Sequence, residues 1–156
     1  RDEMYMRYMA GQKQVIKTGE IEGVPFKIKI DSYHPGKAII DQKIMKDMGG
    51  VWKDGLKLSF VEAWGYDISA AIYQHIEGNK LPVFLAVGTK EKPEPDLAII
   101  SIPQDRLDYC LGEVKKVVHR FADIKKGLIQ PTRCEKCAYC RKTKVLTEII
   151  DYTKLE

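Results

Sequence analysis

The chain has 156 residues, 44% of them apolar, and a formal net charge of +4 at pH 7. This size and composition are typical of one domain with a hydrophobic core, and no apolar run approaches the ~20 residues of a membrane span. The small positive charge is compatible with a polyanionic partner without establishing one. Four cysteines and no signal peptide favour a reducing, cytoplasmic location. Because the chain opens inside a helical pattern, we expect the natural protein to continue before Arg1.

The first half of the chain predicts a β-hairpin preceded by a helix end and one strand. Residues 1–10 have a helical pattern, and residues 14–21 have the pattern of a strand. In residues 24–31, Phe26, Ile28 and Ile30 alternate with lysines, so this strand has one buried and one exposed face. Residues 32–36 contain Pro and Gly and predict a turn, and apolar residues from Ala38 begin the return strand. The glycine-rich residues 46–58 predict a loop.

The second half of the chain predicts two helices around a pair of strands. Residues 62–76 predict a helix, because apolar residues recur every four positions. Residues 81–89 and 97–102 predict strands joined by a Pro-rich turn, and residues 104–126 predict a long amphipathic helix. This order predicts an α/β fold, a mixed sheet flanked by helices, with a core of residues 1–130 and a cysteine-containing tail of residues 131–156. The expected apolar stripe of the first helix consists of Trp64, Ile68, Ile72 and Ile76.

Three polar residues of the predicted hairpin form the candidate site. Asp41 and Lys43 are two residues apart on one strand and therefore leave the same face of the sheet. Asp31 lies across the turn and can reach the same point. Two carboxylates and an ammonium at a sheet edge are suited to holding a hard divalent cation and orienting a water. A plain surface Asp–Lys pair, worth less than about 1 kcal/mol, explains the pattern equally well.

Three of the four cysteines form a cluster near the end of the chain. Cys134, Cys137 and Cys140 have the spacing C-x2-C-x2-C, which allows them to ligate one soft metal centre, zinc or an iron–sulfur cluster. A fourth ligand is needed. Cys110 lies on the apolar face of the long predicted helix, so we interpret it as a core thiol and expect the fourth ligand from residues that precede this chain. Unligated thiols are the alternative.

Together these features resemble the phage- and prophage-encoded exodeoxyribonuclease VIII-like (RecE-type) branch of the PD-(D/E)xK nucleases. The resemblance implies a PD-(D/E)xK restriction-endonuclease-like core. The cysteines are also similar to those of AddB and the CRISPR adaptation nucleases, in which a C-terminal cysteine group joins a distant N-terminal cysteine around an iron–sulfur cluster. The stretches that carry the resemblance are KIKIDSYHPGKAIIDQK, FVEAWGYDISAAIYQ, LPVFLAVGTKEKPEPDLAII and RCEKCAYCRKTKVL.

The resemblance implies a Mg²⁺- or Mn²⁺-dependent exonuclease that degrades double-stranded DNA from its ends, 5′ to 3′, in phage recombination. Asp31, Asp41 and the backbone carbonyl of Gln42 would ligate the metal. Lys43 would hold the attacking water or the phosphate, and because its ammonium lies between carboxylates, a general-base role is less expected. Members of this family often work with a single-strand annealing protein, and self-association into a homo-oligomer is left open.

The expected site has four supporting residues. Glu20 or Glu22 is a candidate third acid, and a surface position in the glycine-flanked turn is equally open. The helix after the hairpin usually carries Gln-x3-Tyr in this family. Tyr73 matches the tyrosine, but Ser69 stands at the glutamine position. This departure puts the positioning of DNA, and full activity, in doubt.

A function of another class also fits the sequence. The chain would then be a non-catalytic DNA-binding module organised by a zinc or iron–sulfur cysteine loop. A pure binder has no need of Asp41 and Lys43, so these two residues separate the two hypotheses. The basic residues that would contact phosphates are Arg133, Lys136, Arg141, Lys142 and Lys144.

Overall fold

The computed structural model describes residues 2–53, 55–90 and 93–154. The chain divides into two compact units, Arg1–Ala122 and Asp123–Glu156. We describe each unit by itself. The first unit contains the sheet, its helices and the candidate carboxylate site, and the second contains the cysteine cluster.

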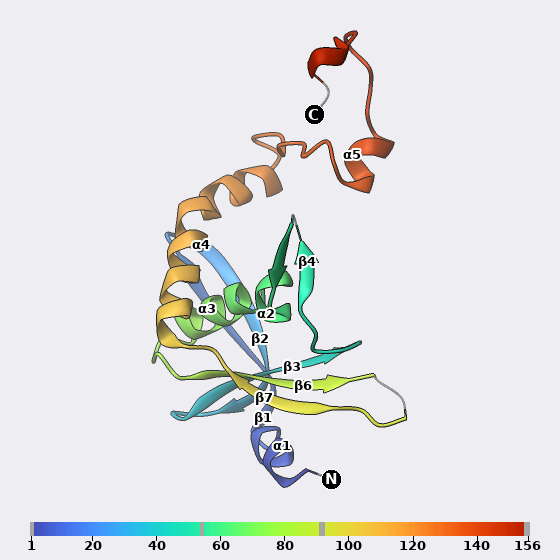
Figure 1. Ribbon diagram of the computed structural model, residues 1–156. Coiled ribbons are helices and arrows are strands. Elements are labelled where there is room, and N and C mark those ends of the chain that lie inside the picture. Colours follow the sequence, from blue (N-terminus) through green and yellow to red (C-terminus); the bar gives the residue numbers. More distant parts are fainter. Residues whose placement is uncertain (1, 54, 91–92, 155–156) are drawn as a thin grey trace. The chain divides into compact units, whose positions relative to one another are not determined.

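A five-stranded mixed sheet forms the centre of the first unit (Figure 1). Its strand order is β1-β2-β3-β6-β7, and only the contact between β3 and β6 is parallel. The predicted α/β architecture, with a mixed sheet flanked by helices, is therefore confirmed. The strands are β1 (Gln12–Ile21), β2 (Val24–His34), β3 (Ala38–Met45), β6 (Val83–Thr89) and β7 (Leu97–Ser101).

The β1–β2 hairpin turns on Glu22 and Gly23, both of which have positive φ angles (49° and 74°). This two-residue turn pairs Ile21 with Val24 and sets the register of the whole hairpin. Strand β2 runs to His34, three residues beyond its predicted end at Asp31. The buried hydroxyl of Ser32 explains part of this difference, because it donates a hydrogen bond to the carbonyl of Tyr8 (3.0 Å) and so joins β2 to the N-terminal helix.

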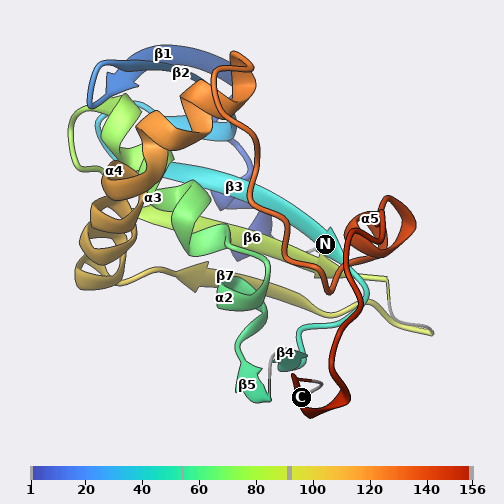
Figure 2. The same ribbon diagram turned by 90° about the horizontal axis from the view of Figure 1, so that it is seen from above.

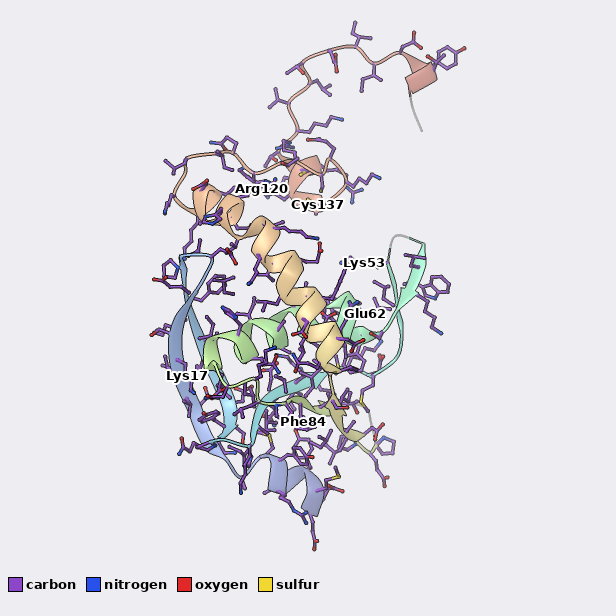
Figure 3. The ribbon with its side chains drawn as sticks, turned by 90° about the vertical axis from the view of Figure 1, so that its left-hand side faces the viewer. Lys17, Lys53, Glu62, Phe84, Arg120 and Cys137 are labelled. Carbon is purple, nitrogen blue, oxygen red and sulfur yellow. The ribbon has the colours of Figure 1, made fainter. Side chains whose placement is uncertain are left out.

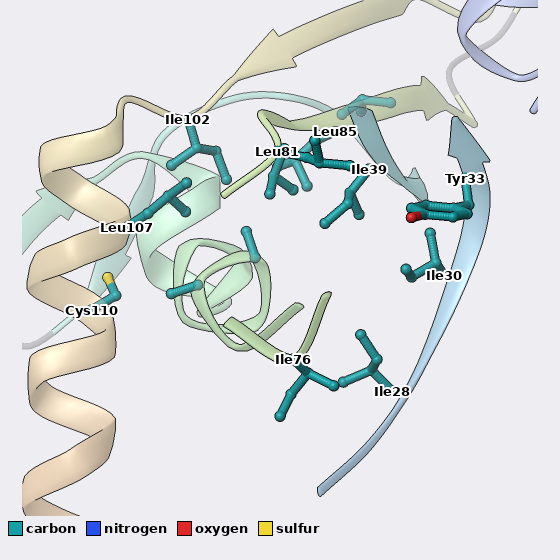
Figure 4. Packing of buried hydrophobic residues seen from close by; sticks show 14 of the residues in the cluster. Ile28, Ile30, Tyr33, Ile39, Ile76, Leu81, Leu85, Ile102, Leu107 and Cys110 are labelled. Carbon is teal, nitrogen blue, oxygen red and sulfur yellow. The ribbon is translucent and has the colours of Figure 1, made fainter. Parts of the chain in front are cut away.

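Helices cover both faces of this sheet. The short helix α1 (Glu3–Tyr8) packs on one face, where the ring of Tyr8 contacts that of Phe84 edge-on, with centroids 5.1 Å apart. Helices α3 (Tyr66–Glu77) and α4 (Gln104–Lys125) lie on the other face (Figure 2). Their apolar side chains pack there against those of the sheet (Figure 4). Because α3 lies between the parallel strands β3 and β6 in the sequence, its packing follows from the crossover that parallel pairing requires. The core on this face includes Ile28, Ile30, Tyr33, Ile39, Ala70, Ile76, Leu81, Val83, Leu85, Ile102, Leu107 and Cys110.

The prediction of a loop over residues 46–58 is wrong in its second half. This segment contains a separate hairpin of β4 (Val51–Lys53) and β5 (Leu56–Leu58). Strands of three residues are too short to show an alternating pattern. The dipeptide Asp54-Gly55, a common signal of a tight hairpin, was the indication that the sequence analysis did not use.

The predicted helix over residues 62–76 is in fact two helices. Helix α2 (Phe60–Ala63) begins with a capping box in which Ser59 and Glu62 bond each other's backbone, and it ends before Gly65, whose φ of 67° is left-handed. The expected apolar stripe is also wrong at its start, because Trp64 is 61% exposed and Ile68 is 44% exposed. The buried residues of α3 include Asp67, Ala70, Ala71, Gln74, Ile76 and Glu77.

The second unit begins with the last residues of α4 and contains little other regular structure. It has one short helix, α5 (Ala138–Lys142), and a 3₁₀ turn at Tyr152–Lys154. Across the described residues of both units, none of the helices combines the length and apolar character that crossing a membrane requires.

Candidate active site

The two predicted carboxylates meet where strands β2 and β3 separate. The backbone ladder between these strands ends at the pair Ser32–Ile40, so Asp31 and Asp41 occupy the next position on each strand. There Asp31 Oδ2 accepts a hydrogen bond from the backbone N–H of Gln42 at 2.9 Å. A side chain thus replaces the backbone of β2 as the partner of β3. This substitution brings the Asp31 and Asp41 carboxyl groups into direct interaction.

Asp41 is buried beside the ammonium group of Lys43. Its side chain is 6% exposed, and its Oδ2 lies 2.7 Å from Lys43 Nζ. Burial raises the pKa of Asp41, and the neighbouring Asp31 raises it further, while Lys43 opposes both effects. Lys43 Nζ also lies 4.8 Å from the centroid of the Tyr66 ring, which keeps the ammonium over an aromatic face.

Gln14 on β1 completes the surroundings of Asp31 and was missed by the sequence analysis. Its Nε2 donates to Asp31 Oδ1 at 2.8 Å. The ladder between β1 and β2 is interrupted only at this pair, and Gln14 has a φ of 54°, which is strained for a residue with a side chain. The sequence did contain a signal: a tight turn at residues 22–23 places residue 14 opposite residue 31. Backbone strain that persists at a carboxylate of this kind is typical of a functional site.

One face of α3 points its polar side chains towards the carboxylates. Tyr66, Ser69 and Tyr73 are spaced by three and four residues and share this face. Burial raises the pKa of Tyr73, with further increases from Asp41 and then Asp31, so its ring is close enough to interact with both. The hydroxyl of Ser69 donates to the carbonyl of Gly65 at 3.3 Å.

Gln74, the neighbour of Tyr73 on α3, has a structural role. It is buried, and its Nε2 donates to the carbonyl of Leu81 at 2.9 Å and to Gln104 Oε1 at the same distance. This side chain therefore ties α3 to the start of β6 and to α4. It lies away from the face that carries Ser69 and Tyr73.

Glu20 and Glu22 lie at the opposite end of the hairpin from Asp31. Glu20 pairs with Pro25, six positions along the ladder from the carboxylates. The carboxylate of Glu22 contacts Lys115 Nζ of α4 at 3.2 Å. The structure does not bring either residue to the candidate site.

The charges of the candidate site match a divalent cation. Two carboxylates face one ammonium, which leaves a net negative charge at a point where Asp41 is already buried. Carboxylate oxygens are the ligands that Mg²⁺ prefers, usually with several waters retained. Asp31 and Asp41 therefore form a fitting pair of ligands, and the carbonyl of Gln42 stays a predicted third.

The second unit brings together the three clustered cysteines. The sulfur atoms of Cys134, Cys137 and Cys140 all lie within 4.8 Å of one another. The backbone N–H groups of Cys137 and Cys140 donate to the sulfur atoms of Cys134 and Cys137, at 3.3 and 3.4 Å. Backbone hydrogen bonds from Cys137 and Lys136 lower the pKa of Cys134 to about 7, whereas burial raises the pKa of Cys140. A loop of converging thiols, one of them with a lowered pKa, fits a soft metal.

Cys110 belongs to the core of the first unit, as its place on the apolar face of the long helix predicted. It is 2% exposed and packs within the buried cluster of α3 and α4. Burial, followed by the nearby Asp67, raises the pKa of its thiol to about 11. A protonated core thiol is a poor metal ligand.

Comparison with known proteins places these features in context. The profile described as "PDDEXK-like domain of unknown function (DUF3799)" matches residues 1–143. The crystal structure of a "putative exonuclease" from Eubacterium rectale is 46% identical to this chain, with a TM-score of 0.85. The similarity covers 97% of this chain and 59% of that one, so the chain spans less than two thirds of the length of this relative.

A second solved structure, that of SSO0001, is 16% identical and has a TM-score of 0.44 over 88% of this chain and 60% of that one. A likeness at this distance does not bear on function. Among curated proteins, none is similar enough in sequence to count as a relative.

Proposed function

The chain belongs to the family of PDDEXK-like domains, and on that premise we propose that it is a metal-dependent nuclease that hydrolyses phosphodiester bonds at the ends of duplex DNA. Family membership confirms the predicted PD-(D/E)xK fold class. The RecE-type branch, phage recombination and a single-strand annealing partner remain parts of the proposal. The related "putative exonuclease" supports the choice of DNA ends over internal sites.

One observation carries this proposal: the meeting of Asp31, Asp41 and Lys43 at the edge of β3. A buried carboxylate with a raised pKa beside a second carboxylate destabilises the metal-free fold, and such groups are typical of functional sites. Structural carboxylates are normally neutralised by several donors, whereas Asp41 has one ammonium partner among the described residues. This arrangement is expected of a cation-binding site.

The residues have distinct roles in the proposed reaction. Asp31 and Asp41 bind the metal, and Gln14 and the Gln42 N–H hold Asp31 in position for it. A bound Mg²⁺ supplies Lewis-acid polarisation of the phosphate and lowers the pKa of a bound water. The ammonium of Lys43, fixed by Asp41 and the Tyr66 ring, orients the water or stabilises the charge that develops on the phosphate.

Digestion of linear duplex DNA by the full-length protein tests the proposal. We expect Mg²⁺-dependent digestion, and we expect the Asp41→Asn variant to lose at least ~10²-fold in rate. The matched control is Asp105→Asn, because Asp105 lies exposed in the first turn of α4 and should tolerate the same exchange. Unchanged digestion by Asp41→Asn contradicts the proposal. DNA binding without any digestion by the wild-type protein favours the non-catalytic module instead.

The substrate form is tested by comparing linear, nicked and closed circular duplexes of one sequence. An enzyme that requires ends should degrade the linear DNA and leave the closed circle intact. Cleavage of the closed circle at a comparable rate contradicts the assignment to DNA ends while leaving the nuclease assignment in place.

We extend the proposal to a structural metal centre at Cys134, Cys137 and Cys140, either an iron–sulfur cluster or zinc. The converging sulfur atoms and the lowered pKa of Cys134 support it. A fourth ligand from elsewhere in the full-length protein would complete the usual four. Anaerobic purification followed by metal analysis tests the extension: about one equivalent of zinc, or iron with matching sulfide, is expected. Absence of both metals contradicts it.

A further inference from the structure

The β4–β5 hairpin carries exposed apolar side chains that the candidate active site does not use. Trp52 is 72% exposed and Leu56 is 64% exposed. The chain has two tryptophans, and the other, Trp64, is 61% exposed at the end of α2. An exposed indole contributes little to folding and is available to stack on a ring of a binding partner.

The ladder of this hairpin places a lysine beside one of these tryptophans. Trp52 and Lys57 are direct partners across the two strands, so their side chains leave the same face. Lys53 pairs with Leu56 and faces the other way. An indole next to an ammonium suits a partner that has a flat ring beside a negative charge, which is the chemistry of a nucleotide.

A chain of side-chain contacts links the hairpin to the candidate active site. Helix α2 contacts both β4 and β5. Phe60 of α2 packs edge-on against Tyr66, with ring centroids 6.4 Å apart, and the same Tyr66 ring lies 4.8 Å from Lys43 Nζ. At its base the hairpin is anchored because Met48 and Val51 pack against the core. Figure 3 shows the hairpin, which carries Lys53, beside the helix that carries Glu62.

We propose that the β4–β5 hairpin binds an unpaired or terminal base of a DNA end, with Trp52 stacked on the base and Lys57 on the neighbouring phosphate. This inference rests on the proposed nuclease function and specifies the form of DNA that the site accepts. Bases inside a duplex offer no free face to an indole, so stacking selects an end with unpaired bases. Because α2 fixes the hairpin relative to Lys43, the bound base sets which phosphate reaches the carboxylates.

DNA binding by the full-length protein in the Asp41→Asn background tests this inference, since that variant should not consume the DNA. The probes are a blunt duplex and the same duplex with a few unpaired bases at one end, with affinity measured by fluorescence anisotropy. We expect Trp52→Ala to weaken binding of the frayed end about 5- to 20-fold and Trp52→Phe to restore most of it. The matched control is Trp64→Ala, which removes another largely exposed indole and should change the affinity less than twofold.

The salt dependence of binding separates stacking from phosphate contact. Trp52→Ala should leave the slope of log K against log [salt] unchanged, whereas Lys57→Ala should reduce it by about one. Lys53→Ala is the control for Lys57→Ala, because Lys53 lies on the opposite face of the same hairpin. The salt slope of Lys53→Ala should stay at the wild-type value.

Several outcomes overturn the inference. Wild-type affinity in Trp52→Ala, equal losses in Trp52→Ala and Trp64→Ala, or no preference for the frayed end each contradict it. If Trp52 is shielded from acrylamide quenching in the free full-length protein, another part of that protein covers the hairpin and the inference fails. A protein that shows the expected binding pattern but no digestion contradicts the nuclease proposal alone.

Discussion

Two buried carboxylates of the first unit, Glu77 and Asp41, have opposite surroundings. Glu77 Oε1 accepts hydrogen bonds from the Tyr33 hydroxyl (2.8 Å) and Lys17 Nζ (3.1 Å), and Asn79 donates to both of its oxygens. Burial alone would raise the pKa of Glu77. These hydrogen bonds outweigh burial, and its pKa falls from 4.5 to about 2. Lys17, on β1, is labelled in Figure 3.

Asp41 has the reverse balance. Burial and the adjacent Asp31 outweigh its one ion pair, with Lys43, and its pKa is raised. A carboxylate that is fully compensated within the protein, such as Glu77, stabilises the fold. A carboxylate that is buried and only partly compensated lacks a positive charge, which a metal ion can supply. We therefore interpret Glu77 as a structural carboxylate and propose that Asp41 is a functional one.

The largest expected difference concerns the lysine of each cluster. Lys43→Met should reduce the rate of DNA digestion at saturating Mg²⁺ by about 10²–10³-fold, because the ammonium no longer acts at the reacting phosphate. Lys17→Met should leave that rate within about twofold, since Lys17 contacts Tyr33 and Glu77 instead. Single-turnover digestion measures both variants. If Lys43→Met and Lys17→Met lost the same share of the rate, the two lysines could not be separated into a functional and a structural one.

Glu77→Gln should have the opposite profile. It removes the charge that three neighbouring residues are arranged to bond, and we expect the free energy of unfolding to fall by about 2–3 kcal/mol. The partial exposure of Lys17 keeps the loss below that of a fully buried pair. Urea unfolding measures the change, and digestion well below the midpoint should continue at the wild-type rate. Asp41→Asn should cost little stability in the same metal-free assay, because it removes a carboxylate that Asp31 repels.

Acid should weaken the stabilising contribution of the Glu77 cluster. The pKa of Glu77 is about 2 in the folded protein and ordinarily 4.5, so its stabilising contribution is complete above about pH 4.5. As the pH falls from there towards 2, the unfolded state gains the proton first and this contribution is lost. We expect the loss to be about 1–3 kcal/mol after allowance for solvent screening. Unfolding midpoints measured from pH 6 to 2.5 should fall more steeply for the wild type than for Glu77→Gln; parallel curves would contradict this assignment.

The elements with strong patterns were predictable from the sequence. The alternation in residues 24–30 gave β2, and the apolar face of residues 104–126 gave α4 to within one residue of its end. Asp31, Asp41 and Lys43 were predicted to meet because a hairpin and a two-residue period determine which side chains share a face. Their catalytic roles stay predictions, as do those of Ser69 and Tyr73.

Other features depended on tertiary structure that no local pattern reports. Trp64 and Ile68 follow the spacing of an apolar stripe, yet the break at Gly65 turns α3 so that Asp67 and Gln74 are buried instead. Burying these polar groups requires partners from α4, namely Arg106 and Gln104, which are distant in the sequence. The contact of Glu22 with Lys115 is of the same kind.

The smallest expected effect separates the two roles of Gln14, which holds Asp31 through its side chain and strains β1 through its backbone. Gln14→Ala loses the hydrogen bond to Asp31, and we expect the Mg²⁺ concentration for half-maximal digestion to rise about tenfold, with the rate at saturating Mg²⁺ nearly unchanged. Gln14→Gly should require as much Mg²⁺ as Gln14→Ala, because both lack the amide.

The two variants should differ in stability. Glycine adopts the φ of 54° without strain, so the free energy of unfolding of Gln14→Gly should equal that of the wild type or exceed it by up to about 1 kcal/mol. The free energy of unfolding of Gln14→Ala should be lower than that of the wild type. A Mg²⁺ titration of digestion and urea unfolding of each variant provide the measurements. If the Mg²⁺ requirement followed stability across the two variants, Gln14 would act through the fold of β1 alone. If Gln14→Gly were as stable as the wild type and still required more Mg²⁺, the amide itself would be the group that holds Asp31 ready for the metal.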